Sequence, residues 1–189
     1  MNLYVVRHGQ SVPNLERRHS GWSMLPLTEQ GEADAKQAGA LLKGIPFDRV
    51  YSSDLTRAVQ TARLALGCEP AQLSVLRERS VGALQEKLVE DCFRDHGDEY
   101  RQARAKLDFT AFGGENIVGL RKRAGEFLEM LENDPQENVA AFSHAGFIEA
   151  VFEIVMNIEL DRTRTMLPNA SILRFVYTDG AWRYCFKTF

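Results

Sequence analysis

Short, mostly apolar runs alternate along the chain with longer segments whose apolar residues recur at helical spacing. Each run is short enough to be a strand that is covered on both faces. These runs are 3–6, 47–51, 73–76 and 139–142. Between them, segments such as 55–66 and 117–131 place apolar residues three or four positions apart, which predicts amphipathic helices. The alternation predicts a mostly parallel sheet with helices on both of its faces.

The second half of the chain adds three features to this pattern. Residues 147–156 are apolar nearly all round, which predicts a buried helix. Two apolar runs flank Asp179-Gly180, a dipeptide that favours a β-hairpin. Residues 80–112 are rich in charges and lose the pattern, so we interpret them as a helical insertion or lid. The predicted fold is a single three-layer α/β/α domain over residues 1–189, with this insertion and a C-terminal antiparallel hairpin.

Two of the predicted helices begin with capping signals. Thr28 precedes an acidic first turn and is a natural N-cap for a helix that runs to about Leu42. Ser52-Ser53-Asp54 offers side-chain oxygens to the helix over 55–66. We expect both helices to be capped by these side chains.

Composition and charge narrow the function classes. The 189 residues are 44% hydrophobic and 26% charged, and the formal net charge is −3. No global basic field attracts nucleic acid or acidic lipid, so an anion site must be built locally. No leader and no apolar segment of the ~20 residues that cross a bilayer are visible, and Cys68, Cys92 and Cys185 form no C-x-x-C pair. We expect a cytoplasmic monomer or homodimer without a disulfide framework, whose partner is a small molecule.

Histidines and arginines follow the predicted strands at the points where these strands end. Arg7 and His8 come directly after 3–6, His144 follows 139–142, and Arg57 lies in the first turn of the helix after 47–51. In open α/β sheets, ligands bind beyond the carboxyl ends of the strands. We therefore expect these side chains, which are far apart in sequence, to converge on one site.

Residues of these types are suited to phosphoryl transfer. Arg7 and Arg57 can each present a fork of donors to phosphate oxygens, and the helix after His144 can add free amides, Ala145 among them. A neutral imidazole is nucleophilic, and the nearby arginines would keep the pKa of His8 low. A departing oxygen needs a proton, and Glu78 follows the predicted strand over 73–76. The residues favour a phosphohistidine intermediate on His8.

The chain resembles the histidine phosphatase (phosphoglycerate mutase-like) superfamily, and in particular its small bacterial-type phosphatases. The resemblance rests on short motifs in the family's order across almost the whole chain. The motifs are Arg7-His8-Gly9-Gln10-Ser11 with Asn14, Pro26-Leu27-Thr28 with Gly31, Ser52-Ser53-Asp54-Leu55 followed by Arg57-Ala58 and Gln60-Thr61-Ala62, Leu76-Arg77-Glu78 with Gly82, Gly114-Glu115, Ser143-His144-Ala145-Gly146, and Pro168-Asn169-Ala170-Ser171.

The resemblance implies roles for the matching residues. His8 would be the phosphorylated nucleophile, and Glu78 the proton donor and acceptor. Arg7, Arg57 and His144 would form the phosphate pocket, with Asn14 assisting. The family's chemistry needs no metal and no cofactor. Two plainer alternatives stay open: Asn14 could cap a turn, and Glu78 could be an ordinary ion-paired carboxylate. We expect His19 and His96 to be surface residues.

The resemblance implies an enzyme, a histidine acid phosphatase-like phosphomonoesterase that hydrolyses a small phosphorylated metabolite. The alternatives are a mutase that returns the phosphate to a sugar acid, and a catalytically silent phosphate-binding module. Mutases of the family tend to be longer, with segments that close over the intermediate, so hydrolysis is favoured. Met24 and Leu84-Gln85 depart from the family's pattern, so we expect the shape of the leaving-group site to differ from that of well-known members. We expect residues 80–112 to form the lid or wall that selects the substrate.

Overall fold

The computed structural model describes residues 1–161, 165 and 167–186. In this part of the chain, six strands form one sheet of order β3-β2-β4-β1-β5-β6. Neighbours among the first four strands run parallel, and β5 pairs antiparallel with both β1 and β6. The strands are β1 (Asn2–Arg7), β2 (Arg49–Ser52), β3 (Ala71–Gln72), β4 (Asn138–Ser143), β5 (Ile172–Thr178) and β6 (Ala181–Cys185).

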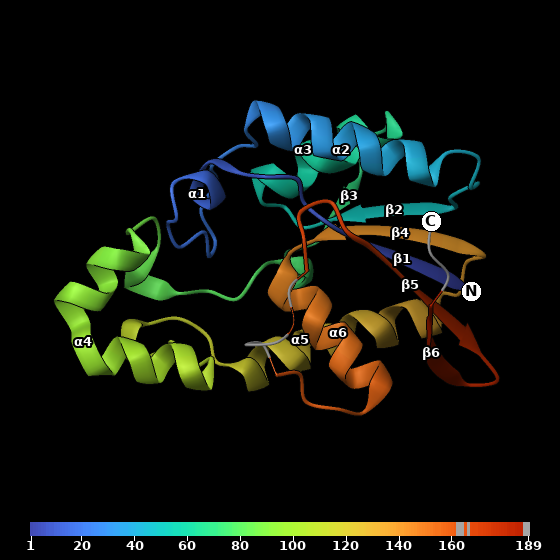
Figure 1. Ribbon diagram of the computed structural model, residues 1–189. Coiled ribbons are helices and arrows are strands. Elements are labelled where there is room, and N and C mark those ends of the chain that lie inside the picture. Colours follow the sequence, from blue (N-terminus) through green and yellow to red (C-terminus); the bar gives the residue numbers. More distant parts are fainter. Residues whose placement is uncertain (162–164, 166, 187–189) are drawn as a thin grey trace.

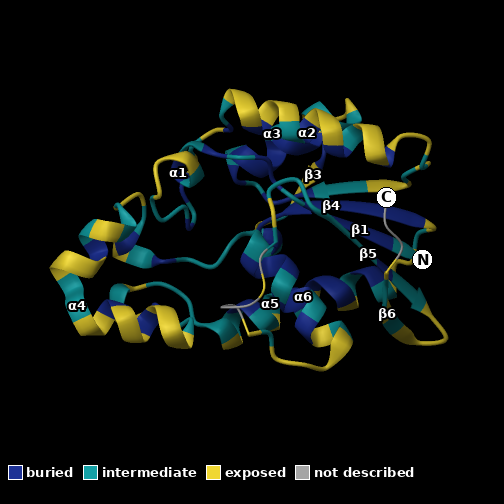
Figure 2. Ribbon diagram, viewed as in Figure 1, coloured by how far each residue is buried: buried dark blue, intermediate teal, exposed yellow. Residues whose placement is uncertain are grey.

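Helices cover both faces of this sheet, which confirms the predicted three-layer α/β fold. Helices α2 and α3 lie on one face, and α5 and α6 lie on the other (Figure 1). The central strands β1 and β4 are largely buried, the strands toward the sheet edges are mostly intermediate or exposed, and the helices keep exposed outer faces (Figure 2). The helices are α1 (Val12–Leu15), α2 (Glu29–Leu42), α3 (Thr56–Leu66), α4 (Val89–Lys106), α5 (Ile117–Asn133) and α6 (Ala145–Met156).

Strand β1 explains why the predicted strands are apolar without alternation. Side chains of a strand point to opposite faces in turn. Leu3 and Val5 join the apolar cluster that includes Phe127 of α5, and Tyr4 and Val6 join the cluster on the α2 and α3 side. Because both faces are covered, every position in the run is apolar. The hairpin between β5 and β6 is confirmed as well.

The predicted strand over 73–76 is wrong. Only Ala71 and Gln72 pair with β2, and residues Ser74–Leu76 form a 3₁₀ turn. Leu76 is fully buried in the cluster that α5 contributes to. This run is therefore apolar because it packs in the core, not because it pairs as a strand.

The capping predictions have different outcomes. Thr28 caps α2, with its side chain accepting a hydrogen bond from the Gly31 amide at 3.1 Å. The second prediction holds only in part: Ser53 Oγ accepts a hydrogen bond from the amide of Leu55, the N-cap of α3, at 3.3 Å, but no side chain caps the free amides of the first turn. The Asp54 carboxylate instead accepts two hydrogen bonds from Arg77, at 2.5 and 2.7 Å. This ion pair attaches the start of α3 to the segment that leads to Glu78.

The insertion over 80–112 is built around α4, which bends at Gly97 (φ 50°, ψ −120°). In Figure 1 this helix stands apart from the two helical layers, beyond the end of the sheet opposite the N-terminus. The bend lets the insertion fold on an apolar cluster of its own. The buried members of this cluster are Val81, Leu84, Cys92, Tyr100, Ala103 and Phe109.

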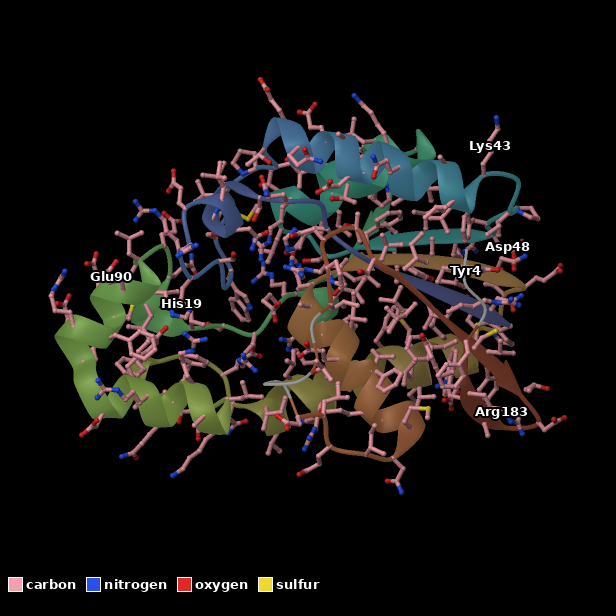
Figure 3. The ribbon with its side chains drawn as sticks, in the orientation of Figure 1. Tyr4, His19, Lys43, Asp48, Glu90 and Arg183 are labelled. Carbon is pink, nitrogen blue, oxygen red and sulfur yellow. The ribbon has the colours of Figure 1, made fainter. Side chains whose placement is uncertain are left out.

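The expectation that His19 and His96 are surface residues is wrong. Both are half-buried. His19 Nε2 is hydrogen-bonded to the Tyr100 hydroxyl, and its ring packs on Phe109 with centroids 5.9 Å apart. The His96 ring packs on Phe112 at 5.1 Å. His19 lies between α1 and α4 (Figure 3), so it joins the insertion to the first loop of the chain.

Two further observations concern the described residues. None of their helices combines the length and the apolar character that crossing a membrane requires. Cys68, Cys92 and Cys185 are free thiols, and Cys92 is buried in the insertion.

Candidate active site

The pairing of β1 with β4 brings two histidines together that are 136 positions apart in sequence (144 minus 8). Arg7 lies opposite Ser143 in the parallel register, so His8 and His144 leave the sheet side by side. Their ring centroids are 5.1 Å apart. The His8 backbone is held on both sides: its amide donates to the Ser143 carbonyl at 3.0 Å, and its carbonyl accepts from Asn169 Nδ2 at 3.1 Å.

The hydrogen bonds of His8 assign its tautomer. Nδ1 lies 2.6 Å from the Gly9 carbonyl, which can only accept, so Nδ1 carries the proton. Nε2 then carries the lone pair, which accepts a hydrogen bond from Arg57 Nε at 3.3 Å. Burial holds the pKa of His8 well below its ordinary value of 6.5, and Arg57 and Arg7 lower it further. At neutral pH, His8 is thus an uncharged imidazole whose lone pair is on Nε2.

Arg57 is a fully buried cation in the first turn of α3. Its Nη1 donates to the Ser23 carbonyl and its Nη2 to the Gly21 carbonyl, both at 2.8 Å. Burial lowers the pKa of Arg57 to about 10, so the group still carries its charge at neutral pH. The loop of Gly21 and Ser23 thus fixes a guanidinium group beside the His8 ring.

Arg7 and His144 leave buried polar atoms without partners at the same place. Arg7 donates from Nη1 to the Leu167 carbonyl, but its Nε has no hydrogen-bond partner among the described residues. The same holds for both ring nitrogens of fully buried His144. Such atoms cost roughly 1–3 kcal/mol each, so native proteins retain few of them. A bound anion would accept hydrogen bonds from Arg7 Nε and from the His144 nitrogen that carries the proton.

Glu78 is brought to this site although the strand predicted before it is absent. Its Oε1 accepts from the Arg79 amide at 2.7 Å, and its Oε2 accepts from the Gly146 amide at 3.1 Å. Its charge also raises the pKa of Arg57 and of Arg7, against the larger effect of burial. The carboxylate therefore lies within electrostatic reach of both predicted phosphate-binding arginines.

An ion pair that sequence reasoning missed holds the segment before Glu78. Arg123 of α5 donates to both carboxylate oxygens of Glu115, at 3.0 and 2.9 Å. Its Nη1 also donates to the carbonyls of Val75 and Arg77, at 2.7 and 3.0 Å. Glu115 belongs to a quoted motif, but Arg123 is one of several charged residues on its helix, and nothing in the sequence distinguishes it.

Asn14 and Ala145 lie at the edge of the site. Asn14 Oδ1 accepts from the Ser11 amide at 3.1 Å and from Asn169 Nδ2 at 3.3 Å. The capping role considered for Asn14 is therefore present, and a phosphate contact stays a prediction. Ala145 is the first residue of α6 and follows its N-cap, His144. Its amide belongs to the helix terminus, where anions are favoured.

A family model described as "Histidine phosphatase superfamily (branch 1)" matches residues 3–186. The chain belongs to this superfamily. Among curated relatives, "2,3-bisphosphoglycerate-dependent phosphoglycerate mutase 2" of Gloeobacter violaceus is 36% identical over 79% of this chain and 73% of the relative. The "Probable phosphoglycerate mutase GpmB" of Salmonella paratyphi A is 30% identical over 96% of this chain and 87% of the relative.

Solved structures of histidine phosphatases have the same fold. The α-ribazole phosphatase of Shigella flexneri superposes with a TM-score of 0.88 at 22% identity, covering 98% of this chain and 95% of that one. A mycobacterial glucosyl-3-phosphoglycerate phosphatase superposes with a TM-score of 0.85 at 24% identity, covering 97% and 96%. At these identities the likeness shows the fold alone. The superfamily includes phosphatases and phosphoglycerate mutase-like proteins, which supports an enzyme.

Gly146 has a position that only glycine tolerates without moving Glu78. A Cβ atom here would clash with the Glu78 carboxylate, the end of a flexible side chain. We expect Gly146→Ala to fold at least as stably as the parent, since alanine favours a helix by up to ~1 kcal/mol over glycine. Hydrolysis of alkyl phosphates should fall about tenfold or more, and that of aryl phosphates less, because a poor leaving group needs protonation.

Gly125→Ala is the matched control for this substitution. Gly125 lies within α5, and no atom beyond its own helix is within 4 Å of the Cβ position. Thermal unfolding should show that Gly125→Ala is more stable than the parent. Its kcat/KM on one alkyl and one aryl phosphate should be unchanged. Equal losses of kcat/KM on the alkyl and the aryl phosphate for Gly146→Ala would show that Glu78 does not protonate the leaving group.

Proposed function

We propose that the protein is a phosphomonoester hydrolase that acts on a small phosphorylated metabolite through a phosphohistidine on His8. The single observation that carries the proposal is the position of His8 Nε2. Nε2 lies 3.3 Å from Arg57 Nε. The site is buried, and within the described residues Arg7 Nε and the His144 ring nitrogens have no hydrogen-bond partners there. A phosphoryl group would supply acceptors for Arg7 Nε and for the protonated nitrogen of His144, and an electrophile for Nε2 of His8.

In the first step, Nε2 of His8 attacks phosphorus in line with the ester oxygen. The N–P bond forms as the P–O bond breaks, and Glu78 gives the departing oxygen a proton, which it regains from water in the second step. Arg57 Nε, freed from the His8 lone pair, can turn its N–H to a phosphate oxygen. Arg7, His144 and the Ala145 amide would hold the remaining charge of the transferred group.

In the second step, Glu78 returns as the base. Its carboxylate takes a proton from water, the resulting oxygen attacks phosphorus, and the N–P bond breaks to release phosphate. The Nδ1–H of His8 stays bonded to the Gly9 carbonyl through both steps, which keeps Nε2 directed at the substrate. Asn14 would steady the loop beside His8 through its contact with Asn169.

The names of the curated relatives favour phosphoglycerate mutase as a second candidate function. A mutase would return the phosphoryl group from His8 to a sugar acid instead of water. Hydrolysis is our first choice; a cavity of about 610 Å³ lined by Arg79, the residue after Glu78, supports it by bringing solvent-accessible space near the proposed base.

One assay distinguishes the two activities. With 3-phosphoglycerate and a 2,3-bisphosphoglycerate primer, we expect released phosphate to exceed 2-phosphoglycerate formed. Conversion to 2-phosphoglycerate faster than phosphate release would establish the mutase instead. Steady turnover of p-nitrophenyl phosphate would exclude a silent binding module, and a panel of phosphorylated metabolites scored by released phosphate would identify the substrate.

A further inference from the structure

Trp22 lies between two parts of the candidate site, and the mechanism described above does not use it. Its chain neighbours, Gly21 and Ser23, supply the carbonyls that hold Arg57. Its indole reaches the other part of the site, because Nε1 donates to the backbone carbonyl of Glu78 at 2.7 Å. The side chain of Trp22 therefore joins the loop that fixes Arg57 to the segment that carries the proposed proton donor.

The carbonyl that Trp22 binds belongs to a peptide group that also binds the Glu78 carboxylate. The other end of this peptide group is the Arg79 amide, which donates to Glu78 Oε1 at 2.7 Å. A trans peptide group is planar, and its C=O and N–H point in opposite directions, so fixing the direction of the carbonyl also fixes that of the amide. The indole thus sets the direction of a donor that holds the carboxylate.

Trp22 is itself held by its backbone and by the face of its ring. Its amide donates to Gln85 Oε1 at 3.2 Å. The Arg77 guanidinium stands 4.8 Å from the ring centroid, where a cation is attracted to an indole. The Asp54 carboxylate binds the same guanidinium at 2.5 and 2.7 Å. The ring is therefore fixed from its face while Nε1 binds at its edge.

A second donor to the Glu78 carbonyl makes a longer bond. Arg123 Nη2 lies 3.3 Å from this oxygen and also donates to Glu115 at 2.9 Å. The indole N–H makes the shorter bond, at 2.7 Å. Loss of the indole N–H should therefore leave the peptide group after Glu78 less firmly oriented, and with it the amide that binds the carboxylate.

We propose that Trp22 is a positioning residue for the proton donor: its indole N–H orients the peptide group after Glu78 and, through it, the carboxylate that protonates the leaving oxygen. The inference rests on the proposed function, since it assigns Trp22 to the proton-transfer step. In this role Trp22 needs no contact with the substrate. Its effect belongs in kcat on substrates that need the proton, not in the binding of phosphate.

Trp22→Phe removes the indole N–H and keeps an aromatic ring beside Arg77. We expect kcat on glycerol 3-phosphate, an alkyl phosphate, to fall about tenfold or more, because a misplaced acid transfers its proton poorly. On p-nitrophenyl phosphate, whose leaving group needs little protonation, kcat should fall less than about threefold. The inhibition constant of inorganic phosphate should stay within about twofold of the parent value.

Glu78→Gln completes a double-mutant cycle. Alone, it should show the same dependence on the leaving group. Added to it, Trp22→Phe should cost little more on glycerol 3-phosphate, because the group that Trp22 positions no longer carries a proton to give. A loss that adds in full would show that Trp22 acts on a different group.

Trp182→Phe is the matched control. Trp182 is the other tryptophan of the chain, and its Nε1 donates to the Glu132 carboxylate at 2.6 Å, between β6 and α5. Both rates should stay within about twofold of the parent. In this background, replacement of tryptophan by β-(3-benzothienyl)alanine substitutes sulfur for the N–H of residue 22 and keeps the bicyclic ring. This protein should reproduce the effect of Trp22→Phe even where phenylalanine disturbs folding.

The outcomes separate this inference from the proposed function. Equal losses on the two substrates, or an unchanged kcat on glycerol 3-phosphate, for both forms altered at residue 22 would overturn the inference alone, provided that Glu78→Gln shows the expected dependence on the leaving group. Glu78→Gln without that dependence would overturn the assignment of Glu78 and the inference together.

Discussion

Replacing His8 with alanine is expected to abolish hydrolysis of p-nitrophenyl phosphate, with a loss of kcat of about 10⁴-fold or more. The substitution removes the attacking Nε2, and no other described nucleophile is fixed in its place. His144 is adjacent, but its ring is centred 5.1 Å from that of His8, so its nitrogens do not occupy the position of His8 Nε2. Initial rates on purified protein, with thermal unfolding as a check of folding, measure the effect.

His96→Ala is a suitable control, because it removes an imidazole from α4 in the insertion and should leave the rate within about twofold. Rapid quenching of the parent enzyme, followed by mass spectrometry, should place the phosphoryl label on His8. A label on a different residue, or turnover that survives His8→Ala, would show that the nucleophile is misassigned.

The layered fold is predictable because a strand that is buried on both faces is apolar at every position. Residues 3–6 and 139–142 are apolar at every position and become β1 and β4. The same apolar pattern gives a wrong strand prediction at 73–76, where Leu76 enters the core from a 3₁₀ turn. Apolarity reports that a segment is covered, but hydrogen-bond partners decide whether it is a strand.

The convergence of His8, Arg57 and His144 is predictable from their places at strand ends, since neighbouring parallel strands end at one edge of a sheet. The groups that hold these side chains in place are not predictable from the sequence. Gly21 and Ser23 hold Arg57 through backbone carbonyls. Every residue has such a carbonyl, so the side chains at these two positions give no signal.

Arg57→Ala is expected to lower kcat/KM by about 10³-fold, because it removes a buried donor directed at the transferred phosphoryl group. Stability should fall as well, by roughly 2–4 kcal/mol, since the buried Gly21 and Ser23 carbonyls lose their partners. Arg57 is the second cause, after burial, of the lowered pKa of His8. Without it that pKa rises, and the acidic limb of the kcat/KM profile should move to higher pH, because protonated His8 cannot attack.

Arg57→Lys and Arg63→Ala separate these effects. Lysine restores a charge near His8 but cannot bind Gly21, Ser23 and His8 together, so the pH profile should recover more than the rate. Arg63 lies on α3 as well, but it is exposed and paired with Glu69 at 2.6 Å, so its loss should change little. A folded Arg57→Ala protein with the parent's kcat/KM would place this guanidinium outside the phosphate pocket. A lower kcat/KM whose acidic limb stays at the same pH would show that Arg57 binds phosphate without changing the pKa of His8.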